Sequence, residues 1–292
     1  MTNLVNSIEK RVKKIFRIEE KVKNDIPLGS ILCKIHDARY GDPFSVIAHA
    51  GGGTQSDGKS AKLYTNSVES VLDSINDGKK LIEIDLQVTK DNHIVALHSW
   101  SEFKSEVSYL NINRKVLHDE SPLTLSEFTA LRDNLDFKPM TLNEVCSIFK
   151  DDPSLILVID KIKNLELLSE YISFKNRVVV EVFTSKEYDL AYSLGFYNVV
   201  MNIDVKKRGI TDWVNKNKIK AVTLSAESVD THPRGFSNAK KLIDSGVVVL
   251  AYTSNNDNFI RDNIGISVSA VYTDYWSLKE RNNKVIGGSV TY

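Results

Sequence analysis

Two histidines and two carboxylates lie near one another in the first part of the chain, each at or near the end of a short apolar run. They are His49, Glu83, Asp85 and His98. Histidine exchanges a proton near neutral pH, and carboxylates bind hard divalent cations. In α/β proteins the carboxyl ends of parallel strands collect at one edge of the sheet, where functional groups meet. These residue types therefore predict acid–base chemistry beside a bound metal ion.

The two acidic residues belong to segment 81–86, in which apolar and acidic side chains alternate. Because successive strand side chains point to opposite faces, Glu83 and Asp85 share one face. Two unpaired charges in a dry interior are costly and repel each other, whereas Mg²⁺ or Ca²⁺ would satisfy both. We expect a divalent metal site here. The alternative is an exposed strand face with two solvated acids.

A glycine-rich turn begins just after His49, and His98 ends the apolar run 93–98. The glycines, beginning with Gly51, allow a ligand to approach the main chain closely. The polar segment 89–92 predicts a hairpin that brings His98 back toward the carboxylates. Two histidines beside a metal can divide the work of general base and general acid. Isolated histidines are usually structural, which is our interpretation of His36, His93, His118 and His232.

The order of these motifs resembles the glycerophosphodiester phosphodiesterase family, within the phosphatidylinositol-phospholipase-C-like phosphodiesterases. That family has a His-Arg-Gly turn, a Pro-Glu-Asn-Thr segment, a Glu-x-Asp strand and a His-Asp pair. The corresponding segments here are 49–51, 65–67, 83–85 and 98–99, and the similarity extends over most of residues 44–278. Segments 122–125 and 139–144 resemble the paired helix-opening segments of the family, and 272–274 resembles its closing strand.

Three departures from the family pattern concern the phosphate. The arginine after the first histidine is Ala50, the glutamate of Pro-Glu-Asn is Thr65, and the aspartate after the second histidine is Ser99. Loss of the arginine removes a bidentate phosphate clamp, so another cation must replace it or the substrate differs. Asn66 of the same motif is retained.

The resemblance also implies a third metal ligand and a phosphate-binding lysine at the end of a later strand. The matching segment 157–161 offers Asp160 as the ligand and Lys161 as the cation, with the spacing changed by one residue. Lys163 therefore competes for the lysine role, and an ordinary ion pair at the strand end is the alternative. Glu181, at the end of another apolar run, is a further candidate near the mouth.

The resemblance implies a metal-dependent hydrolase of a small glycerophosphodiester-like substrate. His49 and His98 would be catalytic, and Glu83, Asp85 and Asp160 would hold Mg²⁺ or Ca²⁺. Substrate contacts are expected from Lys161, Asn66, Gly51, Trp100 and Trp276. The nucleophile is water or a neighbouring substrate hydroxyl. The alternatives are a phosphodiesterase of a nucleotide-activated or surface-polysaccharide intermediate, a sugar lyase on the same barrel, and a catalytically silent barrel that binds a phosphorylated ligand.

Strand and helix patterns alternate through the rest of the chain, which favours a (β/α)8 barrel. We expect strands at 45–49, 81–88, 155–160, 177–182, 197–202, 219–224, 247–252 and 269–273. Helices are expected at 65–77, 141–149, 164–173, 185–194, 207–217, 235–245 and 257–264. Segment 89–140 is too long for a plain connection, so it predicts a hairpin insertion after the second strand with a helix near 124–132.

The predicted organisation is an N-terminal helical extension (1–40), a barrel domain (41–280) and a tail (281–292). Apolar residues at helical spacing among basic ones in the extension favour a helix packed across the bottom of the barrel. A peripheral contact with a membrane surface is the alternative. Lysine plus arginine and aspartate plus glutamate number 38 each, so no basic field favours nucleic acid. The sequence has no pattern typical of a signal peptide or transmembrane span, which gives a cytoplasmic location as the expectation.

Overall fold

The computed structural model describes residues 30–53, 65–107, 119–131 and 137–279. Eight parallel strands form a closed barrel, because β1 pairs with both the second and the last strand of the barrel. The strands are β1 (Val46–Ala48), β2 (Leu81–Val88), β5 (Ile156–Asp160), β6 (Val178–Val182), β7 (Asn198–Asn202), β8 (Ala221–Ser225), β9 (Val248–Tyr252) and β10 (Ala270–Thr273). The expected (β/α)8 barrel is confirmed.

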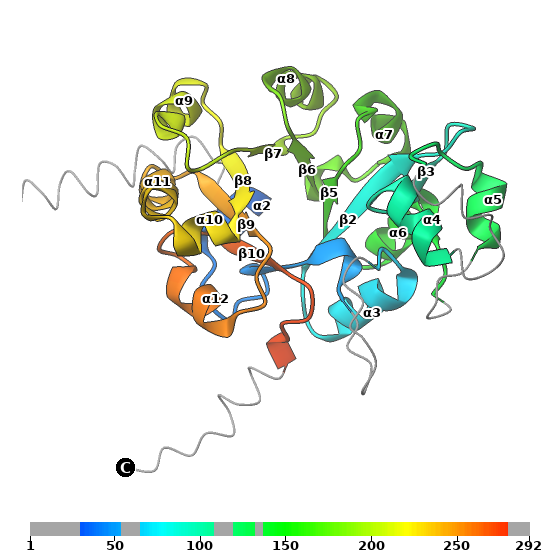
Figure 1. Cartoon of the computed structure of the whole chain (residues 1–292), viewed down its shortest axis with the longest axis horizontal. Helices are drawn as coiled ribbons and strands as arrows, with labels where there is room; N and C mark the ends of the chain where they lie inside the picture. The colour runs from blue at the N-terminus through cyan, green and yellow to red at the C-terminus, as the bar shows by residue number, and fades with distance from the viewer. Residues whose placement is uncertain (1–29, 54–64, 108–118, 132–136, 280–292) are drawn as a thin grey trace, which may run out of the picture.

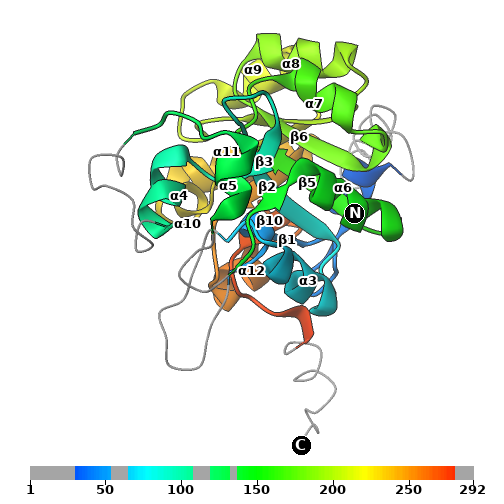
Figure 2. The same ribbon diagram turned by 90° about the vertical axis from the view of Figure 1, so that its right-hand side faces the viewer.

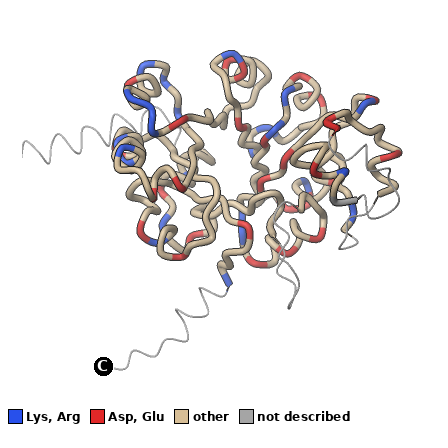
Figure 3. Tube along the Cα trace, viewed as in Figure 1, with Lys and Arg blue, Asp and Glu red and all other residues tan. Residues whose placement is uncertain are grey.

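A ring of helices surrounds the strands, as Figure 1 shows. These helices are α3 (Val68–Asn76), α6 (Leu142–Asp151), α7 (Leu165–Tyr171), α8 (Ser185–Ser193), α9 (Ile210–Lys216), α11 (Pro233–Asp244) and α12 (Asp257–Asn263). Threonine caps and a glutamate three residues later begin α6 and α8, which satisfies backbone N–H groups in the first turn. Acidic and basic residues are mixed around this ring (Figure 3), in keeping with the neutral net charge.

Two helices were not expected from the sequence: α4 (Trp100–Val107), which belongs to the insertion after β2, and α10. Helix α10 (Ala226–Thr231) follows β8 directly and precedes α11. Ser225 caps α10, whereas His232 caps α11 and Pro233 occupies its first turn. The hydrophobic pattern did not reveal α10 because a six-residue helix spans less than two turns.

Alternation along the strands separates two cores. Outward-facing residues such as Ile82 and Ile84 pack under the helices, whereas Leu81, Ile47 and Val158 fill the barrel interior. Toward the amino-terminal ends of the strands, the inner face of the barrel is therefore mainly apolar, with Asn198 of β7 as an exception. Its continuation toward the carboxyl end carries the polar ones, because residues two apart share a face.

Helix α2 (Ile31–Asp37) covers the amino-terminal ends of the strands. Its residues Ile31, Leu32 and Ile35 join the same buried cluster as the inner barrel residues. The amphipathic pattern in residues 1–29, and its packing or membrane contact, lies outside the described residues. None of the described helices has both the length and the apolarity to cross a membrane.

The expected hairpin insertion is present. Strand β2 extends beyond the barrel and pairs antiparallel with β3 (Ile94–Ala96), which pairs with β4 (Met140–Thr141). Helices α4 (Trp100–Val107) and α5 (Leu125–Ala130) pack on this extension (Figure 2). Because β3 returns along β2, the insertion places the start of α4 near the carboxyl ends of the barrel strands.

A single carboxylate fastens the last described residues to the barrel. Asp77, just after α3, accepts hydrogen bonds at Oδ1 from the Ser277 hydroxyl (2.6 Å) and the Lys279 backbone (3.1 Å). Its Oδ2 accepts from the Leu278 backbone (2.9 Å) and the Lys79 ammonium (2.7 Å). These hydrogen bonds hold the segment after β10 against the end of α3.

Replacing Asp77 by alanine should therefore lower the free energy of unfolding by about 1–3 kcal/mol. Burial raises the pKa of Asp77, but hydrogen bonds from Lys79 and Ser277 outweigh it and hold the pKa below its ordinary value. Stability from such a group is present above the unfolded pKa and is lost as pH falls through the folded one. Urea unfolding should show the full difference from wild type at pH 7 and a smaller one below about pH 4. Asp73→Ala, at an exposed acid of the same helix, is the control, and equal stabilities of the two variants at pH 7 would contradict the prediction.

Candidate active site

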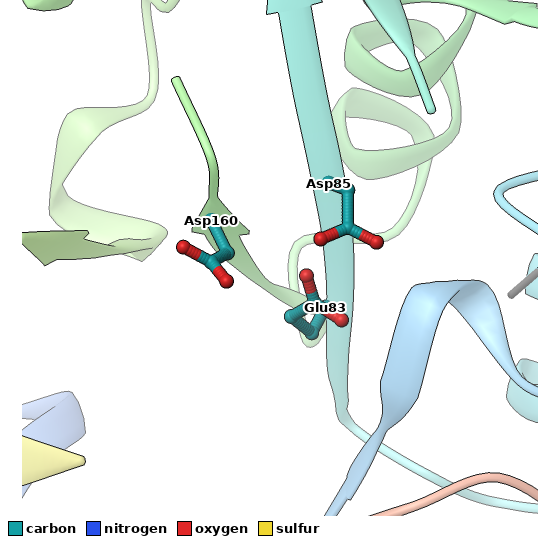
Figure 4. A group of neighbouring side chains, drawn as sticks. All are labelled: Glu83, Asp85 and Asp160. Atoms are coloured by element: carbon teal, nitrogen blue, oxygen red, sulfur yellow. The ribbon is translucent and has the colours of Figure 1, made fainter. Parts of the chain in front are cut away.

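Three carboxylates converge at the carboxyl ends of β2 and β5. Glu83 and Asp85 extend from the inner face of β2, and Asp160 is paired in register with Asp85 on β5. One carboxylate oxygen from each lies within 4.8 Å of the others, and Figure 4 shows the three groups turned toward one another. Glu83 and Asp85 are almost fully buried.

Burial and mutual repulsion act on the charges of this cluster. Burial raises the pKa of Glu83 well above its ordinary value, and the charges of Asp85 and Asp160 raise it further. Burial also raises the pKa of Asp85, although a hydrogen bond from Asn66 opposes the shift. The group is thus costly as three anions unless a cation joins it.

The donor set fits a hard divalent cation. Glu83 Oε2 accepts a hydrogen bond from the backbone of Ala50 at 2.7 Å. Its Oε1 is buried and has no hydrogen-bond partner among the described residues. A buried, unpaired carboxylate oxygen facing two other carboxylates is the environment that an oxygen-preferring cation would satisfy. Glu83, Asp85 and Asp160 are therefore the residues that could hold the metal.

Asn66 orients the cluster. Its amide donates to Asp85 Oδ2 at 3.0 Å, and its carbonyl accepts from the Asp85 backbone at 3.0 Å. Its backbone is left-handed (φ 44°), a conformation that asparagine tolerates better than most residues. The structure thus places Asn66 against a candidate metal ligand.

Gly51 shapes the turn after β1. The backbone is left-handed at both Ala50 (φ 49°) and Gly51 (φ 81°). A Cβ atom at Gly51 would lie 2.7 Å from the Ser70 hydroxyl, closer than real contacts allow. The Gly51 carbonyl accepts a hydrogen bond from Ser74 at 2.8 Å. Gly51 is buried in this packing and positions the turn that carries His49.

Each candidate catalytic histidine is paired with a carboxylate. His49 Nδ1 lies 2.9 Å from Asp274 Oδ1, at the end of the last strand. The other carboxylate oxygen of Asp274 accepts from Asn255 at 2.7 Å. His98 Nδ1 lies 2.5 Å from Glu102 Oε2 on α4. With Nδ1 donating to a carboxylate, a neutral imidazole presents Nε2 as a proton acceptor.

These groups line one cavity of about 300 Å³. Its walls are formed by His49, Glu83, Asp85, His98, Asp160, Lys161, Glu181, Phe183, Asn202, Tyr252, Thr253 and Tyr272. The cavity therefore brings together both candidate catalytic histidines, the three candidate metal ligands and Lys161. Lys163 does not line this cavity.

Lys161 supplies a cation to the cavity. Its Nζ lies 3.0 Å from Asp160 Oδ2. Burial lowers the pKa of Lys161, but the charge of Asp160 and its hydrogen bond raise it overall, so the ammonium stays charged at neutral pH.

Glu181 contributes a fourth buried carboxylate. Its Oε1 accepts hydrogen bonds from Asn202 and Thr223, each at 2.8 Å. Burial, followed by the charge of Asp160, raises its pKa to about 7. The neutral donors around it partly offset the cost of burying this group in the barrel interior.

Comparison with known proteins agrees with this geometry. A model described as the glycerophosphoryl diester phosphodiesterase family matches residues 57–278. The chain belongs to this family. It is accordingly a phosphodiesterase, and the family resemblance noted from the motif order is confirmed.

Solved structures of similar fold have little sequence identity to this family member. A glycerophosphodiester phosphodiesterase from Thermotoga maritima is 22% identical (TM-score 0.58), covering 82% of this chain and 97% of that one. One from Parabacteroides distasonis is 17% identical (TM-score 0.62), covering 90% and 94%. A phosphodiesterase from Oleispira antarctica, in complex with the product sn-glycerol-3-phosphate, is 16% identical (TM-score 0.57), covering 84% and 97%. No curated protein matches the chain.

Two tryptophans from which substrate contacts are expected lie outside the cavity of this phosphodiesterase. Trp100 is buried in the small core of the insertion with Phe128. Trp276 packs against Tyr40, and its indole donates to Asp257 at 3.0 Å. Neither tryptophan lines the cavity. Strand-end aromatics are ambiguous in sequence, because a hydrophobic core and a binding site both favour them.

Sequence reasoning did not identify the carboxylate partners of the histidines. Glu102 follows His98 by four residues, a spacing that brings two side chains together at the start of a helix, but no helix was predicted at 100–107. Asp274 lies 225 residues from His49, and no local pattern connects them. The adjacency exists only because β1 and β10 close the barrel.

The phosphodiesterase should lose divalent cation affinity when Glu83 is replaced by glutamine. The change removes one charge and one donor oxygen, so Mn²⁺ or Ca²⁺ binding measured by calorimetry should weaken by at least about tenfold. Glu227→Gln, at an exposed acid on α10, should bind the metal like wild type. Unchanged metal affinity in Glu83→Gln would count against the assigned ligand set.

Proposed function

We propose that this family member hydrolyses a small glycerophosphodiester-like substrate with His49 and His98 as its acid–base pair and a divalent cation as its cofactor. The observation that carries the proposal is one cavity lined by two carboxylate-paired histidines and a three-carboxylate cluster. The product sn-glycerol-3-phosphate bound to the Oleispira antarctica phosphodiesterase supports this substrate class.

Glu83, Asp85 and Asp160 would hold the cation, here Mg²⁺ or Ca²⁺. When bound, it would supply positive charge that polarises the phosphate and stabilises developing negative charge. Asn66 keeps Asp85 in its orientation through two hydrogen bonds. Lys161 reaches the same cavity and offers its ammonium to a phosphate oxygen.

The histidines move the protons. One Nε2 accepts the proton of the nucleophile, and the other imidazole, in its protonated form, donates to the leaving alkoxide. Asp274 and Glu102 lie within hydrogen-bond distance of Nδ1 of these imidazoles and fix the ring orientation. This division of roles needs no further titratable group, so Glu181 remains outside the proton-transfer steps.

A second candidate function is binding of a phosphorylated ligand without turnover, and Ala50 favours it. The family arginine is absent at this position, and the Ala50 side chain is buried and carries no charge. Its backbone N–H is engaged by Glu83. In this case the lone ammonium of Lys161 would anchor a phosphate that the site does not cleave.

Turnover decides between the two functions. The protein would be incubated with glycerophosphodiesters in Mg²⁺, Ca²⁺, Mn²⁺ or chelator, with phosphorus NMR as the readout. We expect metal-dependent cleavage that chelator abolishes. A phosphomonoester product would identify water as the nucleophile, and a cyclic phosphate would identify a substrate hydroxyl. Binding of phosphodiesters with no cleavage in any metal would favour the silent barrel.

Alanine at His49 or His98 should lower kcat by about 10²–10⁴-fold, because each removes a proton-transfer group. Metal affinity should stay within about twofold of wild type, since neither imidazole belongs to the carboxylate cluster. His93→Ala is the matched control, because His93 belongs to the same insertion but does not line the cavity. Wild-type kcat in both cavity variants would exclude the proposed acid–base pair.

A further inference from the structure

A second cavity adjoins the catalytic one, between the loop after β5 and the turn after β6. It measures about 280 Å³, and its apolar wall is formed by Ile162, Leu165, Val182 and Phe183. The first three side chains are almost fully buried, whereas Phe183 is 49% exposed. A large ring left half in water beside an apolar hollow would gain free energy if a ligand covered it.

The two cavities share part of their lining. Lys161, Glu181 and Phe183 line both of them. The Lys161 ammonium lies 3.0 Å from Asp160 in the catalytic cavity and 5.9 Å from the centre of the Phe183 ring. The Lys161 ammonium, our candidate for binding the phosphate, therefore lies between the carboxylate cluster and the apolar wall.

The chemistry of a phosphodiester suggests how both spaces are used. The catalytic cavity must hold a cation, the phosphate and the attacking group within about 300 Å³. A phosphodiester carries two alcohol groups, one on each side of the phosphate. The adjoining cavity begins at the same lysine, so it is the space next to a phosphate bound there.

We propose that this second cavity, here called the apolar subsite, binds an alkyl or aryl alcohol group of the phosphodiester. The inference rests on the proposed function for the position of the phosphate. Ile162, Leu165 and Val182 offer no hydrogen-bonding side chain, so this wall favours an apolar alcohol; the charged side chains of Lys163 and Glu187 line the rest of the cavity together with Lys161 and Glu181. An alkyl or aryl group that covers Phe183 and this wall would bury apolar surface, which is favourable, whereas a hydroxylated group would bury less of it.

Binding of two alkyl phosphates tests the subsite apart from catalysis. Hexyl phosphate and methyl phosphate carry the same phosphate charge and differ only in apolar length. In calorimetry with Mg²⁺ present, hexyl phosphate should bind at least about tenfold more tightly than methyl phosphate. Equal affinities for the two phosphates would overturn the proposal.

Three variants test whether the difference in affinity between hexyl and methyl phosphate depends on the cavity wall. Phe183→Ala should remove most of the advantage of hexyl phosphate, whereas Phe183→Leu should retain it. Val182→Thr, which changes polarity at similar volume, should reduce it, with circular dichroism confirming the fold. Tyr197→Ala is the control. Tyr197 is an exposed aromatic residue that directly precedes the amino-terminal end of β7. An unchanged difference in both Phe183→Ala and Val182→Thr would refute the subsite.

Turnover distinguishes failure of this inference from failure of the proposed function. With glycerophosphohexanol and glycerophosphoethanolamine as substrates, kcat/KM should favour the hexyl ester. Tighter binding of hexyl phosphate without cleavage of either diester would support the subsite and reject the hydrolysis. Cleavage of both diesters at equal kcat/KM, with equal binding of the two phosphates, would support the hydrolysis and reject the subsite.

Discussion

Repulsion among three carboxylates inside a closed barrel is the constraint on which the remaining structure depends. Glu83, Asp85 and Asp160 lie on inner strand faces whose lower positions are filled with apolar side chains. Three negative charges in such a space are unfavourable unless neighbouring groups compensate. The surroundings supply partial compensation through the Ala50 backbone, the Asn66 amide and the Lys161 ammonium. The remaining deficit is one that a bound cation would satisfy.

The compensating groups are held in unusual backbone conformations. Ala50, Asn66 and Lys161 all have positive φ, as does Gly51, and all four are at or beside the carboxylate cluster. Such conformations persist only where surrounding contacts hold them. Thr65 does so at the turn, because its hydroxyl lies within hydrogen-bond distance of the carbonyls of both Ala50 and Gly52 and of the Ser70 hydroxyl. The side chain that stands in place of the family glutamate therefore supports the backbone that positions the ligands.

Alanine at the position expected for the family arginine would change the balance of charge around a bound phosphate. With Ala50 buried and uncharged, Lys161 and the cation would share the work of holding the phosphate oxygens. Lys161 also borders the apolar subsite through its contact with Phe183. Lys161 would thus contribute both to phosphate binding and to selection of the alcohol group. This links the alanine at position 50 to the choice of substrate.

The sequence by itself determined the alternation of strands and helices, the inner face shared by Glu83 and Asp85, and the hairpin that returns His98. These follow from local periodicity, since strand residues two apart share a face and short polar turns reverse the chain. The tertiary structure decided which groups meet across the barrel. Asp274 reaches His49 only because the first and last strands pair. It also decided that Trp100 and Trp276 pack in hydrophobic surroundings, since burial depends on neighbours from distant segments that a local pattern does not specify.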